Sequence, residues 1–169
     1  KLSHQRSLTI KKISVLIFLL TLSTWMSVPA NCAKPVPKNP AIQKMYDEGL
    51  GLKRAEKIAE AAEVFAKIVR TDPADGDALQ QLATVFSWLK KYDESIAAWK
   101  KAIALNPKNV EYHAGLARVL SWKGDLEQSK NEYLQVLQLS RNDFDALIGL
   151  GDIWMRLGNP GKARGYYLK

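Results

Sequence analysis

The apolar positions of this chain repeat with a period of 34 residues. Between residues 76 and 109 they lie three or four residues apart in two separate runs, which predicts two short amphipathic helices joined by a turn at Lys91-Tyr92-Asp93. The same layout returns twice toward the C-terminus and once toward the N-terminus. A helix pair in every unit of fixed length is typical of a stacked solenoid. We therefore expect an all-α solenoid of about four repeats, at residues 42–75, 76–109, 110–143 and 144–169.

Residues with helix-capping side chains follow the same period. Asp75, Asn109 and Asp143 are 34 residues apart, and each directly precedes a predicted first helix. A side-chain oxygen at such a position accepts a hydrogen bond from a backbone N–H that the helix leaves without a partner. Gly124 and Gly158 stand where first helices end, a place that favours glycine in the left-handed conformation. The helix ends therefore predict the same units as the apolar pattern.

The second unit resembles a known repeat. It reads Leu79-x2-Leu82-Ala83-x2-Phe86, then Tyr92-Asp93-Glu94-Ser95-Ile96-x2-Trp99-x2-Ala102, and ends at Asn106-Pro107. This unit is similar to the tetratricopeptide repeat (TPR), and the resemblance extends from Ile42 to Lys169. It implies a solenoid of helix-turn-helix repeats with period 34, and it says little about function because the matching residues are packing residues.

The resemblance implies a binding groove, because first helices line the concave face of tetratricopeptide arrays. The candidate groove residues, taken from the outward positions of the first helices, are Thr84, Trp88, Arg118, Trp122, Asp152 and Arg156. Trp88 and Trp122 occupy the same register of adjacent units, and two indoles there would form a ladder for sugar rings or aromatic side chains. The alternative is that both indoles close the seams between repeats.

The first 41 residues predict export and a spacer. Residues 1–30 read as a secretory signal, with a basic start, an apolar run from Ile13 to Met26 and a cleavage site after Ala30. An uncleaved N-terminal anchor is the alternative, and either places the repeats outside the cytoplasm. Residues 31–41 form a proline-rich linker. Cys32, the only cysteine, is a lipidation candidate in that linker, and an unpaired thiol is the alternative.

Charge and composition argue against nucleic-acid binding and catalysis. The formal net charge is +8, but residues 1–33 carry four basic residues and no acid, and no basic stripe with aromatics follows. No metal-ligand spacing, phosphate loop or nucleophile motif occurs, so we expect no metal, no cofactor and no enzyme. His113 falls at a buried position and reads as a core histidine with satisfied hydrogen bonds.

The function predicted from the sequence is non-enzymatic. We expect a scaffold that binds a protein or peptide in the bacterial cell envelope, in the periplasm or at the outer membrane, and assists assembly of a larger complex. The alternative rests on a second resemblance, carried by Ser87-Trp88, Ser121-Trp122, Gly115-Leu116-Ala117 and Lys123-Gly124-Asp125. These residues are similar to periplasmic repeats of outer-membrane barrel and exopolysaccharide export proteins, which implies contact with glycan.

The end of the chain bears on membrane attachment. Lys169 falls inside a predicted second helix whose apolar face needs a following element, so we expect a longer protein with a missing C-terminal domain. Attachment to a membrane would come only from the signal or anchor, or from that missing domain.

Overall fold

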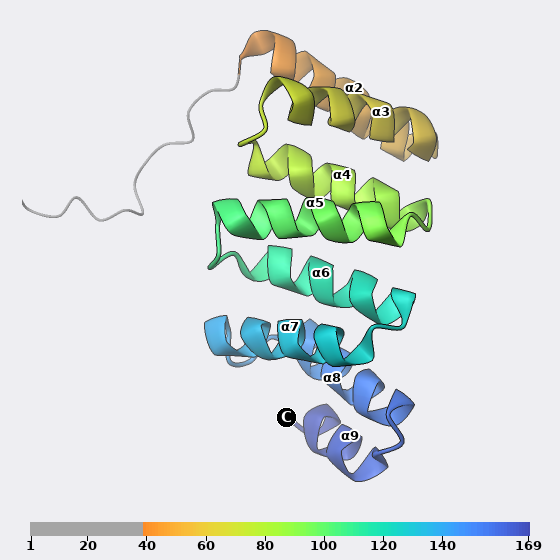
Figure 1. The fold of residues 1–169 in the computed structure, drawn as a ribbon, viewed down its shortest axis with the longest axis vertical. Coiled ribbons are helices and arrows are strands. Elements are labelled where there is room, and N and C mark those ends of the chain that lie inside the picture. The colour runs from red at the N-terminus through yellow and green to blue at the C-terminus, as the bar shows by residue number, and fades with distance from the viewer. Residues whose placement is uncertain (1–38) are drawn as a thin grey trace, which may run out of the picture. The chain divides into compact units, whose positions relative to one another are not determined.

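The computed structural model describes residues 39–169. The predicted signal at 1–30, Cys32 and the linker as far as residue 38 lie outside the described residues. The described part contains eight α-helices and no strand, in the order α2 (Pro40–Arg54), α3 (Ile58–Thr71), α4 (Gly76–Trp88), α5 (Tyr92–Leu105), α6 (Val110–Lys123), α7 (Leu126–Leu139), α8 (Phe144–Arg156) and α9 (Pro160–Tyr167). Each helix packs against the next one along the chain (Figure 1). The predicted all-α solenoid of helix pairs is confirmed.

The first helices begin at the predicted caps. The Oδ1 atoms of Asp75, Asn109 and Asp143 accept hydrogen bonds from backbone N–H groups three residues later, at 3.0, 3.2 and 2.9 Å. Asn39 caps α2 from a different spacing: its Oδ1 accepts from the backbone N–H of Ala41, two residues later, at 2.9 Å, and Pro40 is the first helical residue. The first repeat therefore begins at Pro40, two residues before the predicted start at residue 42, and the predicted linker is shorter by these two residues. Proline suits the first position of a helix because the N–H that it lacks would have no partner within the helix.

One turn within the repeats is shifted from the prediction, and two others have the predicted glycine conformation. The turn expected at Lys91-Tyr92-Asp93 lies at residues 89–91, and α5 begins at Tyr92. Gly124 and Gly158 adopt positive φ, of 102° and 74°, as predicted for residues that end first helices. At the same register of the first two repeats, Glu56 and Lys90 both have φ of 59°. The turn geometry is thus the same in all four repeats, although only two of them carry glycine.

Small residues bring the two helices of a repeat close together. Ser95 and Ser129, both buried on second helices, donate their hydroxyl protons to the carbonyl oxygens of Ala83 and Ala117 at 2.7 and 2.6 Å. Between repeats the large aromatic side chains fill the space, with Trp99 of α5 lying against Gly115 of α6. Three hydrophobic clusters result, each drawn from neighbouring repeats. Among residues 39–169, no helix is both long enough and apolar enough to cross a membrane.

Candidate functional site

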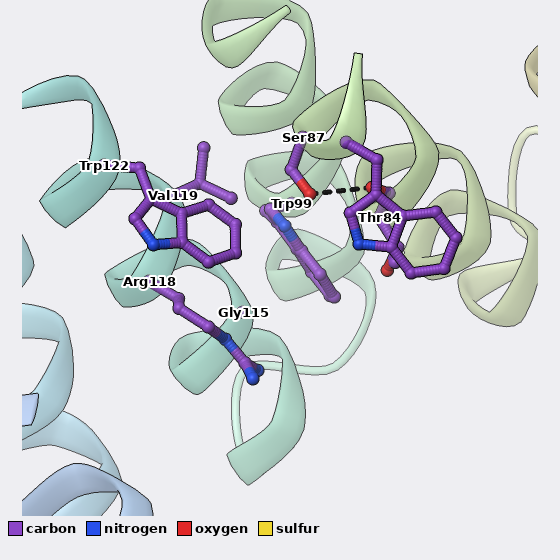
Figure 2. A pocket seen from close by; sticks show the side chains of 8 residues that line it. Thr84, Ser87, Trp99, Gly115, Arg118, Val119 and Trp122 are labelled. Atoms are coloured by element: carbon purple, nitrogen blue, oxygen red, sulfur yellow. Dashed lines mark hydrogen bonds between the residues drawn. The ribbon is translucent and has the colours of Figure 1, made fainter. Parts of the chain in front are cut away.

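The first helices α4, α6 and α8 bring most of the predicted groove residues together around two adjoining pockets. The first pocket, of about 190 Å³, is lined by Thr84, Ser87, Trp88, Trp99, Gly115, Arg118, Val119 and Trp122 (Figure 2). The second, of about 250 Å³, is lined by Ala114, Arg118, Trp122, Tyr133, Asp145, Ile148, Gly149 and Asp152. Arg118 and Trp122 of α6 line both pockets. Arg156 lines neither of them.

The two indoles are half-exposed. Trp88 and Trp122 each keep 51% of their surface accessible, so neither is buried in a seam between repeats. The Lys53 ammonium of α2 lies 5.0 Å from the ring centroid of Trp88, which is cation–π distance. The same ammonium donates to Gln81 Oε1 at 2.6 Å, and burial lowers its pKa from the ordinary lysine value. These contacts hold Lys53 against one indole of the groove.

The hydroxyl groups in the first pocket donate their hydrogen bonds to backbone carbonyl oxygens. Thr84 Oγ1 donates to the Gln80 carbonyl at 2.8 Å, and Ser87 Oγ donates to the Thr84 carbonyl at 2.7 Å, as the dashed line in Figure 2 shows. Arg118 is exposed and forms no hydrogen bond or ion pair with the described residues. No carboxylate or side-chain amide lines this pocket. The polar groups that this pocket offers to a ligand are therefore N–H donors, those of Arg118.

Asp152 and Arg156 make contacts within the array. Asp152 Oδ1 accepts from the Tyr167 hydroxyl at 2.7 Å, and this hydrogen bond raises the pKa of Tyr167. Arg156 Nη1 donates to the carbonyl and the hydroxyl oxygens of Ser121, at 2.7 and 2.9 Å. Arg156 thus joins α8 to the end of α6. Its long side chain crosses between repeats, a contact that the position of residue 156 in the sequence does not reveal.

Trp99 forms part of the pocket floor, which sequence reasoning did not anticipate. Its side chain comes from the second helix α5, reaches the first pocket and is only 5% exposed. Figure 2 places the indole between the helix that carries Thr84 and Ser87 and the one that carries Gly115 and Arg118. Its buried Nε1–H has no hydrogen-bond acceptor among the described residues. The repeat pattern identifies Trp99 only as a core residue, because its register matches the other interior aromatics.

His113 has the role of a packed core residue. Its Nδ1 lies 2.7 Å from Glu132 Oε2, and its Nε2 lies 3.0 Å from the Pro107 carbonyl oxygen. Both ring nitrogens are therefore occupied, and the ring links α6 to α7 and to the preceding loop. No group of three or more metal-ligating side chains occurs within residues 39–169.

Comparison with known proteins identifies the repeat. Residues 89–121 match a family described as "TPR repeat", and residues 123–169 match one described as "Tetratricopeptide repeat". The chain is a tetratricopeptide repeat protein. Its relatives include a BBSome complex member of Xenopus tropicalis, 31% identical over 115 residues, which covers 68% of this chain and 22% of that protein. The chain spans less than a quarter of the length of the curated relatives that it matches, at 22% and 17%.

Solved structures share the fold. One is MamA of Desulfovibrio magneticus RS-1, with a TM-score of 0.71 and 17% identity over 75% of this chain and 72% of that one. Another is the first tetratricopeptide domain of Spaghetti (RPAP3) bound to an HSP90 peptide, with a TM-score of 0.66 and 24% identity over 69% of this chain and 93% of that one. At these identities the likeness establishes the fold alone. The second resemblance, to outer-membrane barrel and exopolysaccharide export proteins, has no support from these relatives.

The repeat also indicates a general class of function. Tetratricopeptide arrays are typically non-catalytic scaffolds for protein–protein interaction, and residues 39–169 have the fold of such an array. The fold by itself does not specify a partner, because the residues that define the repeat are packing residues.

Proposed function

We propose that this tetratricopeptide array binds a protein or peptide partner in the groove lined by Trp88, Arg118, Trp122 and Asp152. The observation that carries the proposal is the pair of adjoining pockets that share Arg118 and Trp122. Apolar indole faces next to an unpaired guanidinium are typical of binding hot spots, where Trp and Arg are enriched. The groove is non-catalytic, and partner binding there assists assembly of a larger complex.

The proposed location is the bacterial cell envelope. The sequence of residues 1–30 supports it, because a basic start followed by an apolar run and small residues at a cleavage site is typical of an exported protein. We propose that the array faces the periplasm or is associated with the outer membrane, held there by a signal anchor, by acylation of Cys32 or by a domain beyond Lys169. Accessibility of the array to protease in spheroplasts, compared with whole cells, tests this location. Protection in both samples would contradict export.

Photo-cross-linking in the producing cell tests the groove. A photoreactive residue at position 148, which lines the second pocket, is compared with one at position 101, an exposed site on α5 that lines neither. We expect a protein adduct from position 148, weakened by Trp88→Ala, and none from position 101. Equal adducts from both positions would contradict the groove.

Glycan binding is the second candidate function, as in the periplasmic portion of an outer-membrane barrel or exopolysaccharide export protein. It is favoured by the half-exposed indoles of Trp88 and Trp122, whose flat faces suit sugar rings. The two candidates differ in their response to salt. Binding of a protein through Arg118 weakens as the salt concentration rises, whereas stacking of a neutral sugar on indole is insensitive to salt. An adduct at position 148 that consists of polysaccharide and survives high salt would favour glycan.

A further inference from the structure

The pocket between α4 and α6 has two indole walls in equivalent positions. Trp88 and Trp122 lie 34 residues apart on adjacent first helices, and each is 51% exposed. Both line the pocket, together with the small side chain of Thr84 and the apolar Val119. Each indole offers a large flat apolar face at low entropic cost, since only two side-chain torsions need to be fixed. The pocket is therefore suited to flat apolar groups that arrive one repeat apart.

The walls and the floor are already in position. Lys53 lies against the Trp88 ring at 5.0 Å and is itself held by Gln81 at 2.6 Å, which restricts the indole. The floor is formed by Trp99 lying against Gly115, where an added Cβ would overlap the Trp99 ring. A rigid groove binds with less ordering of its own side chains, which favours affinity.

The polar groups of the pocket select for an acceptor. The hydroxyl protons of Thr84 and Ser87 are donated to backbone carbonyls, and no carboxylate or side-chain amide lines the pocket. The N–H groups of Arg118 have no partner among the described residues. A ligand rich in carbonyl or carboxylate oxygens and poor in donors fits this chemistry. A sugar, which carries many hydroxyl donors, fits it less well.

A proline-rich segment combines both requirements. Proline has a compact apolar ring and a backbone carbonyl but no N–H, and proline-rich segments adopt an extended helix with three residues per turn. One turn of that helix spans three residues and rises by about 9 Å, so proline rings recur at a regular spacing along one side of it. We expect such rings to contact the indoles of the two neighbouring repeats, while an acidic side chain reaches Arg118.

We propose that the Trp88–Trp122 groove binds a proline-rich, acidic segment of a partner protein, with proline rings on the two indoles and a carboxylate on Arg118. This proposal rests on the proposed function, because it names the ligand of the same groove. Arg118 is the one charged residue among the described residues that line the first pocket, so its guanidinium favours an acidic side chain there.

Labelled oligopeptides test this ligand class. Fluorescence anisotropy measures binding to the full chain of a peptide of repeated Pro-Pro-Glu triplets, beside peptides of Pro-Pro-Lys and Ala-Ala-Glu triplets. We expect the Pro-Pro-Glu peptide to bind at least about tenfold more tightly than either of the others. Trp88→Ala and Trp122→Ala should each weaken its binding by about tenfold or more, as loss of a hot-spot aromatic does.

Further variants separate binding from folding. Trp122→Phe keeps a flat ring and should retain part of the affinity, and Phe144→Ala removes an exposed aromatic that lines neither pocket and should leave it unchanged. Arg118→Gln should remove most of the preference for Glu over Lys. Equal binding of all three peptides, or an equal loss with Phe144→Ala, would overturn the proposal.

The two proposals fail in different ways. A protein adduct at position 148 that depends on Trp88, together with no binding of the Pro-Pro-Glu peptide, would reject the proline-rich ligand and retain the protein-binding groove. Loss of both signals would reject the groove itself. Binding of oligosaccharides that depends on the two indoles, without peptide binding, would assign the pocket to glycan and overturn the proposal.

Discussion

Two helical glycines with different surroundings give opposite predictions. At Gly149 of α8 an added Cβ would overlap the ring of Tyr133, whereas at Gly51 of α2 nothing lies within 4 Å. Gly51→Ala should raise the free energy of unfolding by about 0.5–1 kcal/mol through helix propensity. Gly149→Ala should lower the free energy of unfolding by about 1 kcal/mol or more. The cost of the overlap with Tyr133 is larger than the gain in helix propensity that alanine brings. Urea unfolding of both variants measures the difference, and a shift of the same sign would contradict the packing of Tyr133 on α8.

Tyr46 makes stability fall at alkaline pH. Burial, followed by the hydrogen bond from its hydroxyl to Asp75 Oδ1 at 2.7 Å, raises its pKa above the ordinary value of 10.0. In the folded chain the phenol keeps its proton at a pH where the unfolded chain has lost it. The resulting stabilisation is present below pH 10.0 and declines as the pH rises above it. Tyr46→Phe should lower stability at neutral pH and flatten this decline. Unfolding curves recorded from neutral to alkaline pH test it, and parallel declines in both proteins would contradict it.

The sequence predicts which residues pack but not every residue that meets across repeats. The period alone places Ser95, Ser129 and the interior aromatics, since their roles depend on register. The contacts of Lys53 with Trp88 and of Arg156 with Ser121 depend on long flexible side chains that reach neighbouring repeats. Such contacts depend on the distance in space between neighbouring repeats, and the sequence period does not predict that distance. The same is true of Trp99, whose ring reaches a pocket lined mainly by first helices.

Helix capping distinguishes first helices from most second helices. Asp143 caps α8 by accepting from Ala146 N at 2.9 Å, whereas Asp125 precedes α7 without a side-chain cap hydrogen bond. Asp143→Ala should therefore lower the free energy of unfolding by about 1 kcal/mol. Asp125→Ala should cost less, because it removes only the exposed ion pair with Lys123 at 3.3 Å. Thermal unfolding of the two variants measures this, and equal losses would contradict a capping role for Asp143.

Helix positions are more predictable than turn conformations. The caps at Asp75, Asn109 and Asp143 follow from residue type and period, so the starts of α4, α6 and α8 are predictable to the residue. The left-handed turn at Glu56 and Lys90 is not, because neither residue type indicates positive φ. There the packing of two helices within a repeat dictates a conformation that the local sequence does not favour.

The whole array is built from contacts between neighbours, which explains what the period predicts. A repeat buries its apolar face only against the next one, so the period specifies the stack and the location of a groove on the first helices. The identity of the ligand depends on residues that the packing leaves variable, such as Trp88, Arg118 and Trp122. Export through residues 1–30 stays a prediction from sequence, since those residues lie outside the described part.

Stability should therefore vary along the array. The central helices α4, α5 and α6 pack against helices on both sides, whereas α9 packs against α8 and Ala163 is its one buried residue within the described chain. Amide hydrogen exchange should be slowest in the central helices and fastest in α9, because local opening costs least where few apolar contacts are lost. The Pro-Pro-Glu peptide should slow exchange further in α4 and α6 while leaving α9 unchanged. Uniform protection along the chain would contradict the nearest-neighbour account, and protection confined to α9 would move the binding surface away from the indoles.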